Sequence, residues 1–220
     1  MCGRFTLTMS EAGEIAELLG VEESALAGYK PRYNIAPTQD FFVVRIRYEN
    51  REVVPARWGL INFGATDPRL GARQINAGAE TVNTRAAFRD SFLKRRCIVP
   101  ADGFYEWIGP KSNRRPLWFH RKDRSLFFMA GLYERWHPAP DQWQTTFTII
   151  TCGANSTMAP YHDRMPVILP EDRADDWMDP RNPEPRCLKG LLKPPPDDLL
   201  VSTPASTRIN NSSYDEPDFL

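Results

Sequence analysis

The most reactive group in the sequence lies at its start, where cysteine follows methionine directly in Met1-Cys2-Gly3-Arg4-Phe5. Removal of Met1 would leave Cys2 with a free α-amine and a thiol, which titrate at about pH 8 and about pH 8.5. Such an amine condenses with an aldehyde to an imine, and the thiolate then closes a five-membered thiazolidine ring. From this position alone two alternatives stay open: a processed nucleophile of the N-terminal hydrolase kind, or a small residue buried in a first strand.

Two further side chains interrupt apolar runs in a way that suits proton transfer. Glu106 lies between Tyr105 and Trp107 in a predicted strand, and a carboxylate that rings shield from water is suited to general acid–base work. His162 precedes an apolar strand, and imidazole is the usual proton shuttle near pH 7. Each has a non-catalytic alternative. Glu106 could be the outward side chain of an alternating strand, and His162 could be a structural histidine.

Two asparagines, Asn34 and Asn76, are neutral donors that could hold a sugar or a nucleic-acid backbone. Both fall in segments without clear periodicity, where asparagine is more often a turn former. Their chemistry is therefore a hypothesis that depends on whether the fold brings them to Cys2.

Apolar periodicity predicts the elements that must position these residues. Residues 8–11 fit a capping box, residues 12–19 follow helical spacing, and Gly20 is a natural stop. Further helices are expected at 86–94 and 170–178. Strands are expected at 41–48, 52–58, 97–100, 103–108, 117–120, 126–132, 145–152, 165–169 and 199–202. Residues 31–37 and 62–73 are expected to be loops, and the proline-rich residues 180–196 to lack regular structure.

The length of 220 residues suits one domain. We predict an α+β, mostly β fold: a single compact domain over residues 1–210, with a barrel-like β-sheet core and peripheral helices. Residues 211–220 are predicted to form an acidic, flexible tail.

The composition narrows the compartment and the chemistry. No apolar run approaches the ~20 residues that span a membrane, and no signal peptide is evident, so a cytoplasmic location without membrane partners is expected. The four cysteines contain no C-x-x-C pair, and there are only three histidines. We therefore expect neither a disulfide framework nor a metal site or other cofactor.

The net charge is zero, which taken alone speaks against a nucleic-acid partner. The charge is unevenly distributed, however. Residues 151–220 hold 12 acidic and 7 basic side chains, so residues 1–150 hold 16 and 21 of the totals of 28 and 28. The basic excess could follow a phosphate backbone, although a charge run is more often a solvated face.

Several motifs become specific when they are taken together. In order they are M-C-G-R-F at 1–5, R-Y-N-I-A-P-T-Q at 32–39, W-G-L at 58–60, I-N-A-G-A-E-T at 75–81, R-R-C-I-V-P-A-D-G-F-Y-E-W at 95–107 and H-D-R-M-P-V-I-L at 162–169. This series resembles the SRAP family, the SOS-response-associated peptidase-like proteins that process abasic sites in DNA. The resemblance runs from residue 1 to about residue 210.

The resemblance implies a protein of DNA repair in the SOS response. It would act as a monomer, near the nucleoid when on DNA, on single-stranded DNA that contains an abasic site. Cys2 would form a covalent, lyase-like thiazolidine link to the sugar aldehyde, and the protease label would refer mainly to self-removal of Met1. Asn76 would position the sugar, Glu106 would move protons during imine formation, and His162 would assist ring opening.

The resemblance also suggests DNA contacts. Arg4 and Arg164 would contact phosphates or order the site, and Asn34 and Phe63 are further candidate DNA-binding residues. Two alternatives remain: a non-catalytic module that binds modified DNA, and a cysteine-dependent peptidase that acts mainly on its own Met1.

The sequence departs from the family pattern at positions that are expected to grip DNA. Gly78 stands third in the N-A-R motif, where relatives carry an arginine, and Asn62 and Gly64 replace the proline and the second tryptophan that follow Trp58-Gly59. A missing stacking ring is worth ~1–3 kcal/mol of binding. We therefore expect intact chemistry with weakened affinity, partly compensated by Phe63.

Overall fold

A closed five-stranded barrel forms the centre of the molecule. The structure is a computed structural model that describes residues 2–139, 141–182 and 184–220. The barrel consists of β3 (Asp40–Arg47), β4 (Asn50–Trp58), β6 (Arg96–Ala101), β9 (Phe127–Ala139) and β10 (Gln142–Gly153). β10 closes it, because it pairs with β9 on one edge and in parallel with β4 on the other. The remaining pairs, β4–β3–β6–β9, are antiparallel.

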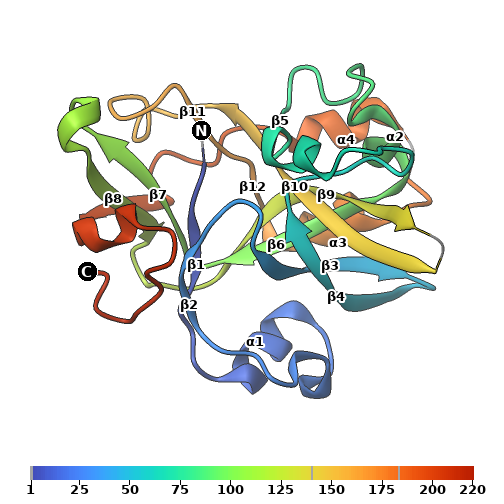
Figure 1. Cartoon of the computed structure of the whole chain (residues 1–220), viewed down its shortest axis with the longest axis horizontal. Coiled ribbons are helices and arrows are strands. Elements are labelled where there is room, and N and C mark those ends of the chain that lie inside the picture. Colours follow the sequence, from blue (N-terminus) through green and yellow to red (C-terminus); the bar gives the residue numbers. More distant parts are fainter. Residues whose placement is uncertain (1, 140, 183) are drawn as a thin grey trace.

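A second sheet lies beside the barrel, and the chain start runs between the two (Figure 1). Its order is β13 (Leu200–Pro204), β8 (Arg115–Arg121), β7 (Gly103–Ile108), β1 (Phe5–Leu7) and β2 (Arg32–Ile35). Asp102 occupies the junction between β6 and β7, where its buried carboxylate accepts from Thr6 Oγ1 at 2.6 Å and Thr8 Oγ1 at 2.6 Å. A hydrogen-bonded carboxylate at this position ties β1 to the barrel.

Three short strands extend β10 and β9 beyond the barrel. β5 (Asn76–Gly78) pairs in parallel with β10, β11 (Arg164–Pro166) pairs with the end of β10, and β12 (Ile168–Leu169) pairs with β9. β5 and β11 therefore meet the same segment of β10, around Thr151, from its two edges.

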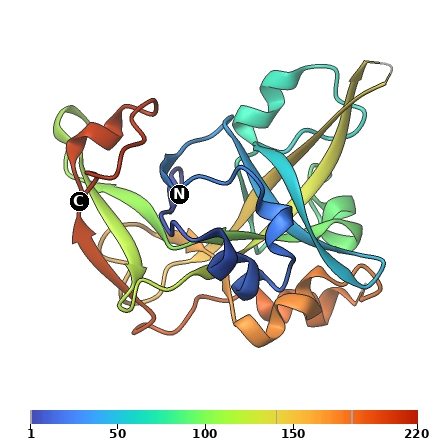
Figure 2. The same cartoon turned by 90° about the horizontal axis from the view of Figure 1, so that it is seen from below.

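Helices lie at the periphery, as predicted (Figures 1 and 2). They are α1 (Ala12–Leu19), α2 (Arg89–Lys94), α3 (Ala174–Met178) and α4 (Pro185–Leu191), with 3₁₀ turns η1 (Glu23–Leu26), η2 (Pro68–Arg73), η3 (Lys111–Asn113), η4 (Glu171–Arg173) and η5 (Thr207–Asn210). Gly20 ends α1 in a left-handed conformation, with φ at 64°. Its start is capped by Glu11 without a side-chain hydrogen bond, so the predicted capping box does not form. In the described part of the chain, no helix has the length and apolarity needed to cross a bilayer.

The mostly β fold with a barrel-like core is confirmed, but three segments differ from expectation. Residues 32–35 form β2 rather than a loop, because the edge of β1 supplies their pairing partner. The proline-rich tract contains α4, where Pro185 stands in the first turn and forfeits no helical hydrogen bond.

The third difference is the C-terminal segment, residues 205–220, whose last ten residues we expected to be flexible. Asp215 Oδ1 accepts the backbone N–H groups of Tyr33 at 2.6 Å and Asn34 at 2.8 Å, along β2. Phe219 is buried against Tyr105 and Trp118. The segment folds back (Figure 2). The Asp215 carboxylate satisfies edge donors of β2, and the Phe219 ring packs against Tyr105 and Trp118.

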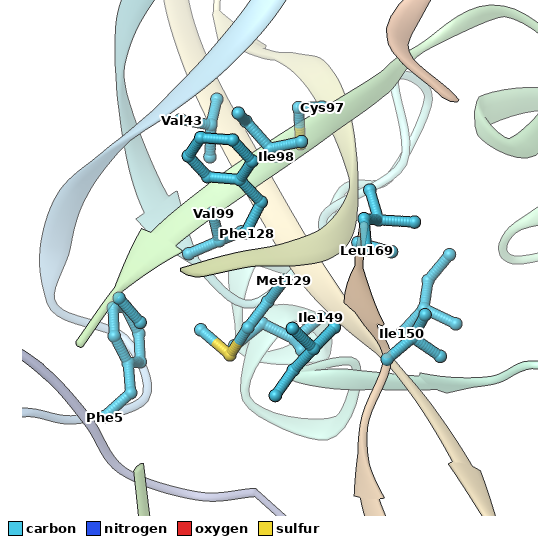
Figure 3. Packing of buried hydrophobic residues seen from close by; sticks show 14 of the residues in the cluster. Phe5, Val43, Cys97, Ile98, Val99, Phe128, Met129, Ile149, Ile150 and Leu169 are labelled. Carbon is cyan, nitrogen blue, oxygen red and sulfur yellow. The ribbon is translucent and has the colours of Figure 1, made fainter. Parts of the chain in front are cut away.

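The core is a continuous cluster in which barrel strands and flanking elements meet. Figure 3 shows Val43, Val99, Met129 and Ile149, one from each of four barrel strands, gathered with Phe5 from β1 nearby. Each such side chain contributes roughly 1.5–3 kcal/mol when fully buried. This rigid core fixes the ends of β1, β7 and β10, where the candidate site lies.

Candidate active site at the amino terminus

Strand pairing places Cys2 next to Glu106. β1 pairs with β7 with Phe5 opposite Phe104, and the backbone N–H of Tyr105 donates to the carbonyl of Arg4 at 3.0 Å. Continuing this antiparallel register by one step brings Glu106 opposite Gly3. Cys2 then lies one residue further along the same edge, between the two sheets.

Asn76 holds the other side of Cys2. Its side-chain Nδ2 donates to the Cys2 carbonyl at 2.8 Å, and β5 fixes Asn76 against Ile149 of β10. The Oδ1 atom of Asn76 is buried and has no hydrogen-bond partner among the described residues. A buried acceptor without a hydrogen bond costs free energy. This oxygen is therefore well placed to accept a hydrogen bond from a hydroxyl group of a ligand.

The environment of Cys2 controls its reactivity. The residue is fully buried, and burial raises the pKa of its thiol well above the usual range, with the charge of Glu106 acting in the same direction. Glu106 itself is only 5% exposed, which excludes the alternative that it is an outward side chain of an alternating strand. The buried thiol of Cys2 therefore lies within electrostatic range of the buried side chain of Glu106.

His162 lies in the loop between β10 and β11. Its Nδ1 accepts the backbone N–H of Arg164 at 2.9 Å, which places the ring proton of the neutral imidazole on Nε2. Asp163 Oδ1 lies 2.9 Å from the same Nδ1 atom.

Arg164 is engaged beside β5 and β10. Its guanidinium makes two bonds to Glu80, at 2.7 and 3.0 Å, and one to the carbonyl of Thr151 at 2.6 Å. The pair raises the pKa of Arg164 and lowers that of Glu80. Gly78 is adjacent: a Cβ there would lie 3.1 Å from Glu80 Oε2 and 3.5 Å from Arg164 Nη2.

Arg4 borders an open polar cleft of about 620 Å³ next to Cys2. Its guanidinium donates to Asn34 Oδ1 at 3.0 Å and to the carbonyl of Ile209 at 2.8 Å, and it lies over the ring of Trp107. The cleft is lined by Gly3, Arg4, Trp107, Ser112, Asn113, Arg114, Thr207 and Asn210. Cations and an indole ring around an open cleft suit a phosphate-linked, base-bearing ligand.

Two of the residues expected to bind DNA do not line this cleft. Asn34 is fully buried, and its Nδ2 donates to the carbonyls of Ile209, Asn211 and Tyr214, so in this conformation it anchors the C-terminal segment and cannot touch a ligand. Phe63 is 58% exposed but packs against the β9–β10 hairpin, at the opposite end of β10 from Thr151.

Two residues that line the cleft were not predicted as site residues: Arg114 was noted only as part of the basic excess of residues 1–150, and Asn210 was not singled out. Arg114 and Asn210 lie almost a hundred residues apart, and Asn210 Nδ2 donates to the Arg114 carbonyl at 3.4 Å. Each belongs to a polar turn, which carries no periodic signal. Only the docking of the C-terminal segment brings them beside Arg4.

Comparison with known proteins identifies the family of the chain. The family model described as SOS response associated peptidase (SRAP) matches residues 1–212. The abasic site processing protein YoqW of Bacillus subtilis is 38% identical over 223 residues, covering 100% of this chain and 99% of its own. The abasic site processing protein YedK of Escherichia coli is 30% identical over 182 residues, covering 81% of this chain and 79% of its own.

The fold also matches a solved structure over nearly its whole length. A crystal structure of a protein from Bacteroides thetaiotaomicron superposes with a TM-score of 0.83 at 26% identity, over 94% of this chain and 93% of that one. The sequence match extends over nearly the whole chain and includes every segment that builds the Cys2 site. The chain belongs to the SRAP family.

Proposed function

We propose that this protein processes abasic sites: it binds single-stranded DNA that contains one and becomes covalently linked to it through Cys2 once Met1 is removed. The observation that carries the proposal is the setting of Cys2, whose carbonyl is held by Asn76 at 2.8 Å and whose thiol is buried next to Glu106. The names of relatives 30–38% identical point to the same substrate.

The chemistry follows from an amine and a thiol on one residue. The α-amine of Cys2 attacks the aldehyde carbon of the ring-opened sugar, and the resulting carbinolamine loses water to give an imine. The thiol then adds to the imine carbon while its proton passes to the nitrogen, which closes the thiazolidine ring. One water is released, and no oxidant or reductant is needed.

Three side chains have separate roles in this sequence. Glu106 delivers a proton to the departing hydroxyl and can receive the proton of the Cys2 thiol, because burial keeps that thiol protonated until the imine has formed. Asn76 accepts a sugar hydroxyl through Oδ1. His162, with Nε2 carrying the proton in its neutral form, assists opening of the sugar ring.

The test is a denaturing gel after the protein is mixed with abasic single-stranded DNA. A shifted band should form with the wild type and with Cys187→Ala, which removes an exposed cysteine, but not with Cys2→Ala. Cys2→Ser should give only an imine that borohydride traps. Intact mass should show loss of Met1.

The other outcomes separate the alternatives. Loss of Met1 without any crosslink would leave only self-processing peptidase activity. Binding to abasic DNA without a crosslink would indicate a non-catalytic module. A stable crosslink at wild-type yield from Cys2→Ala would refute the role of Cys2.

A further inference from the structure

A cluster of aromatic rings, two of them largely exposed, lies outside the Cys2 site at the β9–β10 hairpin. Phe63, His137 and Trp143 form it, and we call it the aromatic platform. The His137 and Trp143 rings lie 4.4 Å apart between centroids, and Phe63 lies 6.0 Å from Trp143 and 6.4 Å from His137. We propose that this platform stacks unpaired bases of the DNA strand that flanks the abasic site, an inference that rests on the proposed function.

The exposure of the rings argues for a partner. Phe63 is 58% exposed and Trp143 is 50% exposed, although both already contact other rings. About half of the surface of Phe63 and of Trp143 therefore stays open to solvent, within one patch. Bases offer flat π-faces of matching size, and stacking on aromatic side chains tolerates any sequence.

The platform is held rigidly, so little conformational entropy is lost on binding. The buried Trp136 donates from Nε1 to the carbonyl of Ala65 at 2.8 Å, which ties the Phe63 loop to the hairpin. On the other side of Phe63, Asn62 Nδ2 donates to the carbonyl of Ala87 at 2.9 Å. The loop is pinned on both sides of the exposed ring.

Charge next to the rings favours a nucleic acid as the occupant. The Arg135 guanidinium lies 4.5 Å from the centroid of Trp143. Arg135 pairs with Thr145 and Arg57 with the adjacent Thr146, so two exposed arginines flank this end of β10. Rings that stack bases beside cations that pair with phosphates are the combination that single-strand binding surfaces use.

β10 connects the platform to the Cys2 site. Trp143 lies near its start and Thr151, which contacts Arg164 and pairs with Gly78, lies near its end. The eight residue-to-residue steps from Trp143 to Thr151 span about 26 Å at the usual strand rise. A DNA strand bound at Cys2 would therefore need several further nucleotides to reach the platform, which would supply rings that position 64, a glycine here, does not.

The test compares oligothymidines of increasing length, without damage, bound to the wild type, Phe63→Ala, Trp143→Ala and the double variant. Each lost ring should weaken binding about 5- to 150-fold, the worth of one stacked base, but only for strands long enough to reach the platform. Trp143→Phe, which keeps a ring, should restore most of the affinity. With strands that contain an abasic site, lengthening the DNA should increase the affinity on only one side of the lesion.

The matched control is Tyr48→Ala. Tyr48 is 82% exposed with Arg47 5.0 Å from its ring, but it lies at the tip of the β3–β4 hairpin, which Figure 2 shows well separated from the β9–β10 hairpin. Tyr48→Ala should bind every strand like the wild type.

Unchanged affinity of the double variant for long strands would overturn the inference and leave a non-DNA surface. An equal loss at all lengths together with a lower melting temperature would also overturn it, because the rings would then only stabilise the hairpin. Crosslinking of a short abasic strand should be the same in every variant. Absence of that crosslink in the wild type would refute the proposed function alone, since the length dependence with undamaged DNA is measured separately.

Discussion

At the scale of single residues, the proposed chemistry depends on the position of Glu106 next to Cys2. Replacing Glu106 with glutamine removes the proton carrier but keeps the shape, so we expect single-turnover crosslinking at saturating DNA to slow by about 10²–10⁴-fold. The matched control is Glu134→Gln, because Glu134 is equally buried, 5% exposed, yet pairs with Arg95 away from Cys2.

The Glu134 variant should lower the melting temperature without slowing crosslinking. If both variants crosslink at the wild-type rate, Glu106 is a structural residue of β7 and the proton transfers belong to another group.

Position 78 lies beside the ion pair of Glu80 and Arg164, next to the candidate site. An arginine there would stand beside the Glu80–Arg164 pair, and the close Cβ contact is with the flexible carboxylate end of Glu80. Since Glu80 can pair with only one guanidinium fully, Gly78→Arg should leave one cation free for DNA. We expect tighter binding of undamaged single strands and a salt slope steeper by about 0.7, measured by titration at several salt concentrations.

Gly78→Ala is the control for the Gly78→Arg titrations, because it adds the Cβ without the charge. It should keep the wild-type slope. An unchanged slope with Gly78→Arg as well would mean that residue 78 does not face the DNA backbone.

At the scale of elements, the C-terminal segment is part of the site's support. Asp215 accepts two backbone N–H groups of β2 and pairs with Arg32. Asp215→Ala leaves these groups without an acceptor, so the free energy of unfolding should fall by about 1–3 kcal/mol in urea titrations. Asp218→Ala, which removes an exposed partner of Arg208, should cost no more than about 1 kcal/mol.

Equal effects of the two aspartate variants would mean that residues 211–220 are only loosely attached. If Asp215→Ala instead destabilises as expected, it should also weaken DNA binding at the cleft, because Arg4 is held by Asn34 and Ile209, which this segment fixes.

The sequence predicted elements with strong periodicity and missed those defined by docking. Residues 103–108 were expected as a strand and form β7 with the same bounds. Their aromatic and β-branched side chains favour an extended conformation over a helix. β2 and the C-terminal segment were missed because each is held in place by the other. Asp215 accepts a backbone N–H of β2, and the Asn34 side chain of β2 donates to the Tyr214 carbonyl of the segment. Within the site, motif order indicated Cys2, Asn76 and Glu106, whereas the burial of Asn34 depends on a contact 180 residues away.

At the scale of the whole molecule, buried thiols and phenols should make the free energy of unfolding fall at alkaline pH. Burial raises the pKa of Cys2 and Cys97, and it also raises the pKa of Tyr29 and Tyr105, whose hydroxyls donate to backbone carbonyls. The unfolded chain releases these protons from about pH 8.5 for thiols and about pH 10 for phenols, while the folded chain keeps them. The stabilisation is therefore complete below about pH 8.5 and is lost as pH rises.

Urea unfolding between pH 7 and pH 10.5 should accordingly show a free energy of unfolding that declines above about pH 8.5, since the unfolded state binds fewer protons there. Cys97→Ala should lower stability at pH 7, because it empties space in the core, and should flatten the first part of the decline. Tyr105→Phe should flatten the part above about pH 10, and Cys187→Ala, at an exposed position, should change neither. A stability that stays constant up to pH 10.5 would mean that the core admits these charges, and the enclosed, protonated state of the Cys2 thiol would have to be abandoned with it.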